Sequence, residues 1–288
     1  MASPSQILIT KANGDIVPFS VDKLRRSLRN AGASEEAAGD VADEILRSLE
    51  SGATTKKIYR QAFDLLKQTN RPVAARYRLK EAIMALGPSG FPFEKYFGEI
   101  LKHQGYSVQV GQIVQGRCVT HEIDVIAEKD NDQIMVECKY HNQPGKVTDV
   151  KVPLYIRSRF LDVKDVWEEQ PQNRSKVHQG WVATNTRFTG DALRYGLCKG
   201  MHMVSWDFPQ KSSLKDQIDT LGLYPITCLT TLTSQEKRLL LEKNIVLCKE
   251  LCRQPDWLAQ IGVTSLRIEK TMEEGRFLCQ TLVRHGQH

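Results

Sequence analysis

The sequence lacks the features that mark membrane and secreted proteins. None of its apolar runs reaches the roughly 18 residues needed to cross a bilayer, and no signal-peptide pattern follows Met1, so we expect a cytoplasmic protein without membrane contact. Its seven cysteines are odd in number and scattered, which argues against a disulfide framework. Cys248 and Cys252 stand near each other without the second pair or the histidine of a zinc site, so we interpret them as small buried side chains.

The sequence also lacks the motif Gly-x-x-x-x-Gly-Lys-Ser/Thr, which argues against a phosphate-binding loop that hydrolyses nucleotides. What is present is an ordinary globular composition. The 288 residues, of which 41% are hydrophobic and 26% charged, are enough for two or three domains with their own cores. The formal net charge of +6 favours anionic partners such as nucleic acids.

Two apolar stretches in the middle of the chain carry acidic residues. Residues 123–127 and 134–137 are typical of buried strands, and the polar residues between them predict a hairpin. Asp124 lies in the first strand and Glu137 at the end of the second, with Lys139 on the same sheet face as Glu137. Carboxylates in buried strands are costly unless they are paired or bind a cation, so the pattern predicts a hard-cation site beside an ammonium. The simpler alternative is a sheet edge at which Lys139 neutralises Glu137.

Asp124 followed by Glu137-Cys138-Lys139 resembles the Asp...Glu-x-Lys signature of the PD-(D/E)xK nucleases, in their Mrr-like restriction endonuclease branch. The segment from Trp181, WVATNTRFTGDALRYG, resembles the later strand, turn and helix of that branch. The expected order of elements is also similar: a helix opened by Phe93-Glu94, strands at 108–114, 123–127 and 134–137, a helix at 146–160, and strands at 181–183 and 203–206. The sequence departs from the family at His121-Glu122, where a Gly-Gly pair is common, and it shows no counterpart of a glutamine in the family's helix.

The resemblance implies metal-assisted hydrolysis of phosphodiester bonds in DNA. Asp124, Glu137 and the Cys138 carbonyl would hold Mg²⁺ or Mn²⁺ through oxygen ligands. Lys139 would orient or help to deprotonate the attacking water and offset charge in the transition state.

Residues around this signature have weaker assignments. Glu94 lies at the margin of its helix's apolar stripe and is the better candidate to support metal or water, whereas Glu99 points well away. His121 shares a strand face with Ile123 rather than with Asp124, so we expect no metal role for it. Five residues beyond the strands either follow DNA phosphates or form ordinary surface charge: Asp149, Lys151, Tyr155, Arg157 and Arg159.

The first ninety or so residues predict a compact unit of their own. Residues 7–10 and 16–17 suit a short hairpin, because Asn13-Gly14 supplies the positive φ angles of a tight turn. Four amphipathic helices follow: one after the N-cap residue Ser20, one after Ser34, one through 58–65 and one through 73–84.

This unit resembles the ATP cone, a regulatory nucleotide-binding module of ribonucleotide reductases and their nucleotide-sensing repressor. The resemblance rests on Ile9-Thr10-Lys11-Ala12-Asn13-Gly14, on Phe19 with Lys23-Leu24, on Thr54-Thr55 with Ile58, and on Ala74 and Tyr77. It implies ATP or dATP as an effector, with the phosphates at Lys11 and Lys23, the Asn13-Gly14 backbone near the nucleotide, and Tyr77 in the site. Ala12 stands where the family usually has arginine. The alternative is that Lys11, Lys23, Arg25 and Arg26 form a solvated basic face.

The cluster Gly87-Pro88-Ser89-Gly90 predicts a domain boundary. We therefore expect a mixed α/β protein with an ATP-cone-like domain at 1–88, a nuclease domain at 91–209 and a small α-helical domain at 214–288, reached through a linker at 211–213. Helices are expected in the last domain at 234–242, 246–252, 256–261 and 264–279. Residues 258–264 resemble a helix-hairpin-helix turn, which can hold a phosphate. The alternative is a plain packing or dimerisation module.

Together these features predict a Mg²⁺- or Mn²⁺-dependent DNA endonuclease whose cleavage is regulated by ATP or dATP. By family analogy it acts in restriction or defence, and we expect it to form a homo-oligomer. Two alternatives stay open. One is a nucleotide-responsive DNA-binding regulator that keeps the nuclease fold without cleavage, and the other is a repair nuclease that acts on branched DNA.

Overall fold

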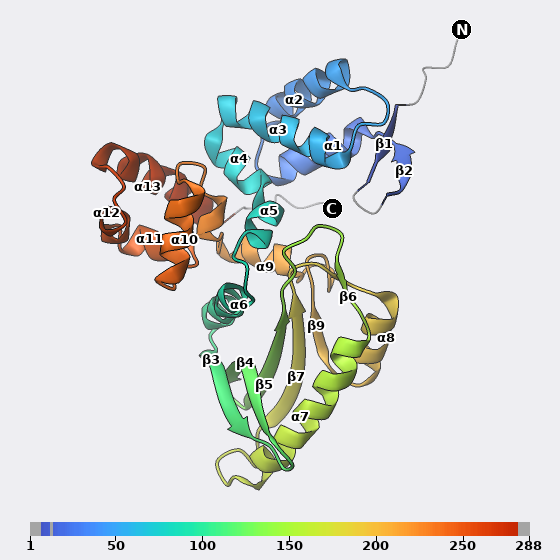
Figure 1. Ribbon diagram of the computed structural model, residues 1–288, viewed down its shortest axis with the longest axis vertical. Coiled ribbons are helices and arrows are strands. Elements are labelled where there is room, and N and C mark those ends of the chain that lie inside the picture. The colour runs from blue at the N-terminus through green and yellow to red at the C-terminus, as the bar shows by residue number, and fades with distance from the viewer. Residues whose placement is uncertain (1–6, 12–13, 282–288) are drawn as a thin grey trace.

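The computed structural model describes residues 7–11 and 14–281, and it has the mixed α/β architecture that the sequence predicts. Figure 1 shows three groups of elements: an N-terminal hairpin with helices, a twisted sheet flanked by helices, and a cluster of C-terminal helices beside the junction of the first two. Among the described residues, no helix is long and apolar enough to cross a membrane.

The N-terminal unit is a hairpin followed by short helices. Strand β1 (Leu8–Thr10) pairs antiparallel with β2 (Ile16–Pro18). The side chains of Ser20 and Ser34 cap α1 and α2 by accepting hydrogen bonds from backbone N–H groups of the first turns. Arg78 leaves helical geometry, so the single helix expected through 73–84 is instead two helices. The helices are α1 (Val21–Asn30), α2 (Glu35–Ser48), α3 (Thr55–Thr69), α4 (Arg71–Tyr77) and α5 (Leu79–Met84).

The central sheet has five strands in the order β3-β4-β5-β7-β9. Its first three strands are antiparallel to one another, and β7 and β9 continue the sheet parallel to β5. The order follows from the chain, because a short turn joins β4 to β5 whereas a helix crosses over between β5 and β7. The strands are β3 (Ser107–Gln115), β4 (Thr120–Lys129), β5 (Asp132–Lys139), β7 (Val177–Thr184) and β9 (His202–Val204).

The two faces of the sheet are covered by different helices. On one face lies α6 (Phe91–His103), whose Phe93 and Phe97 pack in one buried cluster with Val125. On the other face lie α7 (Lys151–Glu169) and α8 (Gly190–Cys198), and here Phe160 and Met135 share a second cluster. The helices α6 and α7 therefore flank the end of β5 from opposite sides (Figure 1).

The helix expected at 146–160 begins and ends later than the sequence predicts. Residues Val147–Thr148 form β6, which pairs parallel with β8 (Arg187–Phe188) and so cannot be helical. The helix α7 then starts at Lys151, and Pro153 is tolerated because it lies in the first turn, where no intrahelical N–H partner is needed.

The C-terminal helices share a core with the rest of the chain. The largest buried cluster joins α5, α6, one face of the sheet and the C-terminal helices. Residues 211–213 are not a free linker, because Ser213 is buried and caps α9 in a capping box with Asp216. The elements are α9 (Leu214–Leu221), the short 3₁₀ helix η1 (Ile226–Cys228), α10 (Ser234–Glu242), α11 (Cys248–Arg253), α12 (Asp256–Gln260) and α13 (Ser265–Cys279).

Candidate active site

Two neighbouring strands bring the predicted acidic residues together. The Val125–Val136 pair sets the antiparallel register of β4 and β5, and this register places Asp124 beside Glu137. The Cys138 backbone N–H donates a hydrogen bond of 2.7 Å to Asp124 Oδ2. Glu137 is only 5% exposed, so it is a buried carboxylate that requires partners.

Glu137 meets three donors. Lys139 Nζ lies 3.0 Å from Glu137 Oε1, as expected for residues two apart on one strand face. Helix α7 supplies the other two: the Tyr155 hydroxyl donates to Oε1 at 2.8 Å, and Arg159 Nη1 donates to Oε2 at 2.9 Å. Both oxygens of Glu137 are therefore engaged, and two cations face its negative charge.

Lys139 holds its proton firmly. Burial alone lowers the pKa of Lys139, but hydrogen bonds with Tyr155 and Glu137 and the negative charge of Glu137 outweigh burial and raise that pKa above its ordinary value. Lys139 Nζ also lies 5.5 Å from the centroid of the Tyr155 ring. The side chain is therefore an ammonium at neutral pH, suited to donate hydrogen bonds and to supply positive charge.

Asp124 and Glu94 are the carboxylates with less compensation. Glu94 projects from the first turn of α6. Burial, and after it the negative charge of Asp124, raises the pKa of Glu94 to about 7. Burial and the negative charge of Glu137 likewise raise the pKa of Asp124 to about 6, in spite of the hydrogen bond from Cys138. This side of the site is short of positive charge.

The carboxylates of Asp124, Glu137 and Glu94 are suitable ligands for a hard divalent cation, but they are not arranged to coordinate one in this structure. Mg²⁺ and Mn²⁺ prefer oxygen ligands such as carboxylates. The raised pKa values of Asp124 and Glu94 indicate that added positive charge would stabilise their ionised forms. Within the described part of the chain, however, no three histidine, cysteine, aspartate or glutamate side chains are arranged to hold an ion. An ion at this site would therefore have to take Glu137 from Lys139 or Arg159.

Sequence reasoning missed the roles of Tyr155 and Arg159. The sequence left both residues open between DNA contact and surface charge. The structure instead places both against Glu137, on the helix in which the sequence shows no counterpart of the family's glutamine. Arg159 Nη2 also donates to the Glu122 backbone carbonyl, which fixes α7 to β4. The available signal was their spacing of four residues on the helix that follows the acidic strand, which puts both on one helix face.

Glu99 and His121, for which the sequence predicts no role in the site, pair elsewhere. Glu99 pairs with Lys102 on its own helix at 2.6 Å. His121 Nε2 lies 2.7 Å from Asp162 Oδ2 of α7. The partners of both residues therefore lie outside the Asp124–Glu137 cluster.

The predicted nucleotide residues partly come together in the N-terminal unit. Lys11, Lys23 and Tyr77 line one cavity of about 270 Å³, between the hairpin, α1, the start of α3 and α4. Gly14 has a φ of 89°, the left-handed conformation that a tight turn requires, but it does not line this cavity. Asn13 lies outside the described residues.

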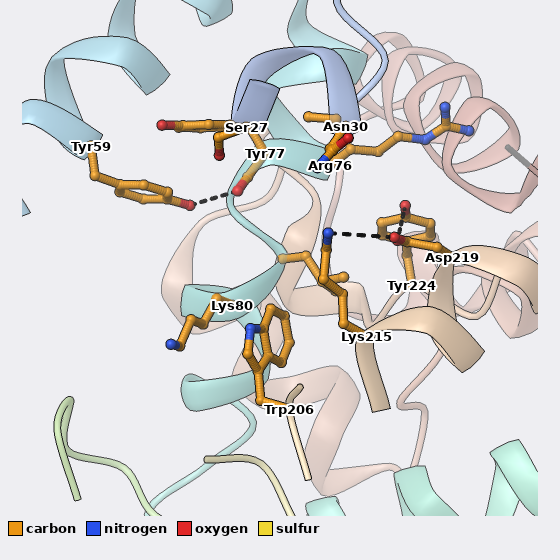
Figure 2. Close-up of a pocket in the computed structure, with 12 residues that line it drawn as sticks. Ser27, Asn30, Tyr59, Arg76, Tyr77, Lys80, Trp206, Lys215, Asp219 and Tyr224 are labelled. Carbon is orange, nitrogen blue, oxygen red and sulfur yellow. Dashed lines mark hydrogen bonds and ion pairs between the residues drawn. The ribbon is translucent and has the colours of Figure 1, made fainter. Parts of the chain in front are cut away.

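A second cavity of about 310 Å³ lies where the three groups of elements meet (Figure 2). Tyr59 and Tyr77 stack with ring centroids 4.7 Å apart, and the two rings line both cavities. Lys215 Nζ lies 3.8 Å from Asp219 Oδ2 on the opposite side. Arg76 also lines the cavity, and its guanidinium extends toward the end of α13, where it donates to two backbone carbonyls (Figure 2). The tyrosine pair therefore separates the first cavity from the junction.

Family models match three successive segments of the chain. Residues 7–81 match the ATP cone domain, residues 87–207 match the model described as restriction endonuclease, and residues 224–279 match the model described as AF1548-like, C-terminal. The first two matches confirm the two resemblances found in the sequence.

A curated protein and a solved structure each match about two thirds of the chain. The chain is 33% identical over 178 residues to an uncharacterized protein of Archaeoglobus fulgidus, an alignment that covers 62% of this chain and 96% of that protein. The crystal structure of AF1548, a protein of unknown function, is similar with 30% identity and a TM-score of 0.54, and the match covers 65% of this chain and 97% of that one.

Proposed function

The chain belongs to the AF1548-like family and joins a restriction endonuclease domain of the Mrr type to an ATP cone, and from this premise we propose that it is a metal-dependent DNA endonuclease whose cleavage is regulated by ATP or dATP. The observation that carries the proposal is the meeting of Asp124, Glu137 and Lys139 at the end of two strands, with Glu94 beside them. Acidic groups short of positive charge next to a firmly protonated lysine are what hydrolysis of a phosphodiester requires.

Each side chain has a role that its environment supports. Asp124, Glu137 and the Cys138 carbonyl would hold Mg²⁺ or Mn²⁺, which when bound polarises a phosphate oxygen and lowers the pKa of water. Lys139 remains protonated, so it orients the attacking water and offsets negative charge instead of removing a proton. Glu94, with its pKa raised to about 7, can accept a proton from that water near neutral pH.

The regulatory part of the proposal rests on the N-terminal cavity. Lys11 and Lys23 bring two positive charges to the cavity that Tyr77 closes on its inner side. Lysine suits such a place because its compact charge can follow flexible phosphates. The absence of a hydrolytic phosphate-binding loop from the sequence supports the nucleotide as an effector rather than a fuel.

The test is cleavage of plasmid DNA with Mg²⁺ or Mn²⁺, with and without ATP or dATP. We expect cleavage that a chelator stops, that a nucleotide changes in rate, and that is lost in Asp124→Ala, Glu137→Ala and Lys139→Ala while DNA binding stays largely intact. Lys102→Ala, which removes an exposed lysine of α6, is the matched control and should cleave normally. Wild-type cleavage by one of the three variants would remove that residue from the mechanism.

One observation favours a second candidate function, a nucleotide-responsive DNA-binding regulator without cleavage. Glu137 is already engaged by Lys139, Tyr155 and Arg159, and such a set of contacts also suits a nuclease fold kept as a binding scaffold. A change in DNA mobility that depends on nucleotide, without cleavage under any metal condition, would support the regulator over the enzyme.

A further inference from the structure

A basic cleft separates the ATP cone from the nuclease domain. Two adjoining cavities, of about 600 and 530 Å³, lie between the start of α3 and the nuclease domain. The loop between β5 and β6 extends from the sheet toward the hairpin β1–β2 in Figure 1 and forms the opposite wall. The residues that both cavities share are Lys11, Thr55, Lys80, Met84 and Pro144.

The cleft concentrates positive charge: five of its lining residues are basic and one, Glu81, is acidic. Arg187, on the nuclease side, also pairs with Asp207 at 2.6 Å. Lys11, Lys56, Lys80 and Lys146 line it, and none of these four lysines forms an ion pair within the part of the chain that the structure describes. The pKa of Lys80 is lowered, first by burial of its ammonium and then by the positive charge of Arg187. A cleft with these charges is suited to a multiply charged anion.

The cleft is continuous with the cavity in the ATP cone. Lys11 and Thr55 line both the cleft and the cavity that Lys23 and Tyr77 line. A nucleotide in that cavity with its phosphates at Lys11 therefore directs them toward the cleft. This continuity favours a nucleotide over DNA as the source of the phosphates.

The loop on the nuclease side begins at the catalytic strand. The Thr184 hydroxyl donates to the Lys139 carbonyl at 2.7 Å. The Asn185 side chain bonds both the N–H and the carbonyl of His141, each at 2.8 Å. These contacts fix the start of the loop, whereas Lys146 near its other end is exposed and lines the cleft.

We propose that the phosphates of a nucleoside triphosphate held in the ATP cone occupy this cleft and bridge Lys11 of the cone to Lys146 and Arg187 of the nuclease domain. The inference rests on the proposed nucleotide regulation, and it adds the residues of the nuclease domain that contact the bound nucleotide. A bound triphosphate joins the two domains through the loop that follows Lys139. A monophosphate is too short to make the second contact.

The experiment measures binding of ATP and AMP to the full-length protein by competition with a fluorescent ATP analogue. Lys146→Ala should weaken ATP binding about threefold to tenfold, because it removes one exposed charge-assisted hydrogen bond to the phosphates. Lys146→Ala combined with Arg187→Ala should weaken it further. AMP binding should not change in either variant. Lys199→Ala is the control: it removes an exposed lysine of the same domain that does not line the cleft, and it should bind ATP normally.

The outcomes separate this inference from the function on which it rests. If the double variant binds ATP as the wild type does while Lys23→Ala binds it poorly, the bridge is wrong and nucleotide regulation stands. If the wild type binds no nucleotide, both the bridge and the proposed nucleotide regulation are wrong. If the double variant keeps ATP affinity but loses affinity for a short duplex DNA, measured by fluorescence anisotropy, the cleft belongs to the DNA path and the inference is overturned.

Discussion

Replacing Arg159 tests whether the ion pairs around Glu137 compete with a metal ion. Arg159 Nη1 donates to Glu137 Oε2 at 2.9 Å, on the oxygen that Lys139 and Tyr155 leave free. Arg159→Met keeps most of the apolar stem that packs along α7 and removes only the charged group. Glu137 then has one oxygen, Oε2, without this donor, and under the proposed function that oxygen is free to bind a divalent ion.

The size of the effect follows from the exposure of the pair. A hydrogen bond to a charged group contributes about 1.5–3 kcal/mol. The Arg159 side chain is 23% exposed and Glu137 keeps two other donors, so without metal we expect the variant to lose about 1–2 kcal/mol of unfolding free energy. In the variant, Mg²⁺ no longer has to displace Arg159 from Glu137. The Kd of the variant for Mg²⁺ should therefore be about tenfold lower than that of the wild type, which corresponds to about 1.4 kcal/mol.

Thermal unfolding across a series of Mg²⁺ concentrations measures both effects without requiring cleavage. A ligand that binds only the folded state stabilises it by an amount that grows with the logarithm of the ligand concentration relative to its Kd. Mg²⁺ should therefore raise the melting temperature of Arg159→Met at lower concentrations than it does for the wild type. Arg157→Met is the matched control, because Arg157 lies on the same helix but stacks on Phe160 and does not contact Glu137. An unchanged or weaker response to Mg²⁺ in Arg159→Met would refute the competition.

Two further predictions concern protonation and the junction between the units. The pKa values of Asp124 and Glu94 are raised to about 6 and about 7 in the metal-free protein, so both carboxyls hold their protons more tightly in the folded state than in the unfolded state. The unfolding free energy should therefore fall as pH rises toward 7. Over the same pH range Mg²⁺ should bind more tightly, and its binding should release protons. Proton release in weak buffer measures this, and Glu94→Gln should lose the step near pH 7. Arg76→Met should cost about 2–4 kcal/mol of unfolding free energy in urea denaturation, because the 7% exposed Arg76 donates to two carbonyls at the end of α13, whereas exposed Arg71→Met should cost little. Equal losses for the two arginine variants would contradict this role of Arg76.

The meeting of Asp124, Glu137 and Lys139 was predictable because it depends on local rules. The hairpin turn fixes the register of β4 against β5, and the two-residue period of a strand puts Glu137 and Lys139 on one face. The helix starts at Ser20 and Ser34 were predictable for the same reason, since an N-cap acts within four residues. Both predictions use only neighbours in sequence.

What the sequence did not predict depends on contacts between distant segments. Tyr155 and Arg159 reach Glu137 only because α7 packs across the sheet at one particular rotation, which its own periodicity does not determine. Residues 147–148 form a strand instead of part of the expected helix, because they pair with residues 187–188, forty positions later in the chain. The helix α9 was missed because it is short and its apolar residues are buried against α6 and the other C-terminal helices, which are distant in the sequence.

The helices α4 and α5 give a physical reason why the three units respond together. Ala74 and Tyr77 belong to the buried cluster of the ATP cone, whereas Ala75 and Leu79, one or two positions away, belong to the cluster shared by the nuclease domain and the C-terminal helices. The α5 backbone is also held from the other side, where the Thr227 hydroxyl donates to the Ala82 carbonyl at 2.7 Å. Close-packed cores transmit small displacements instead of absorbing them. A ligand that moves Tyr77 therefore acts on a helix turn whose opposite face is already part of the core beneath β4 and β5.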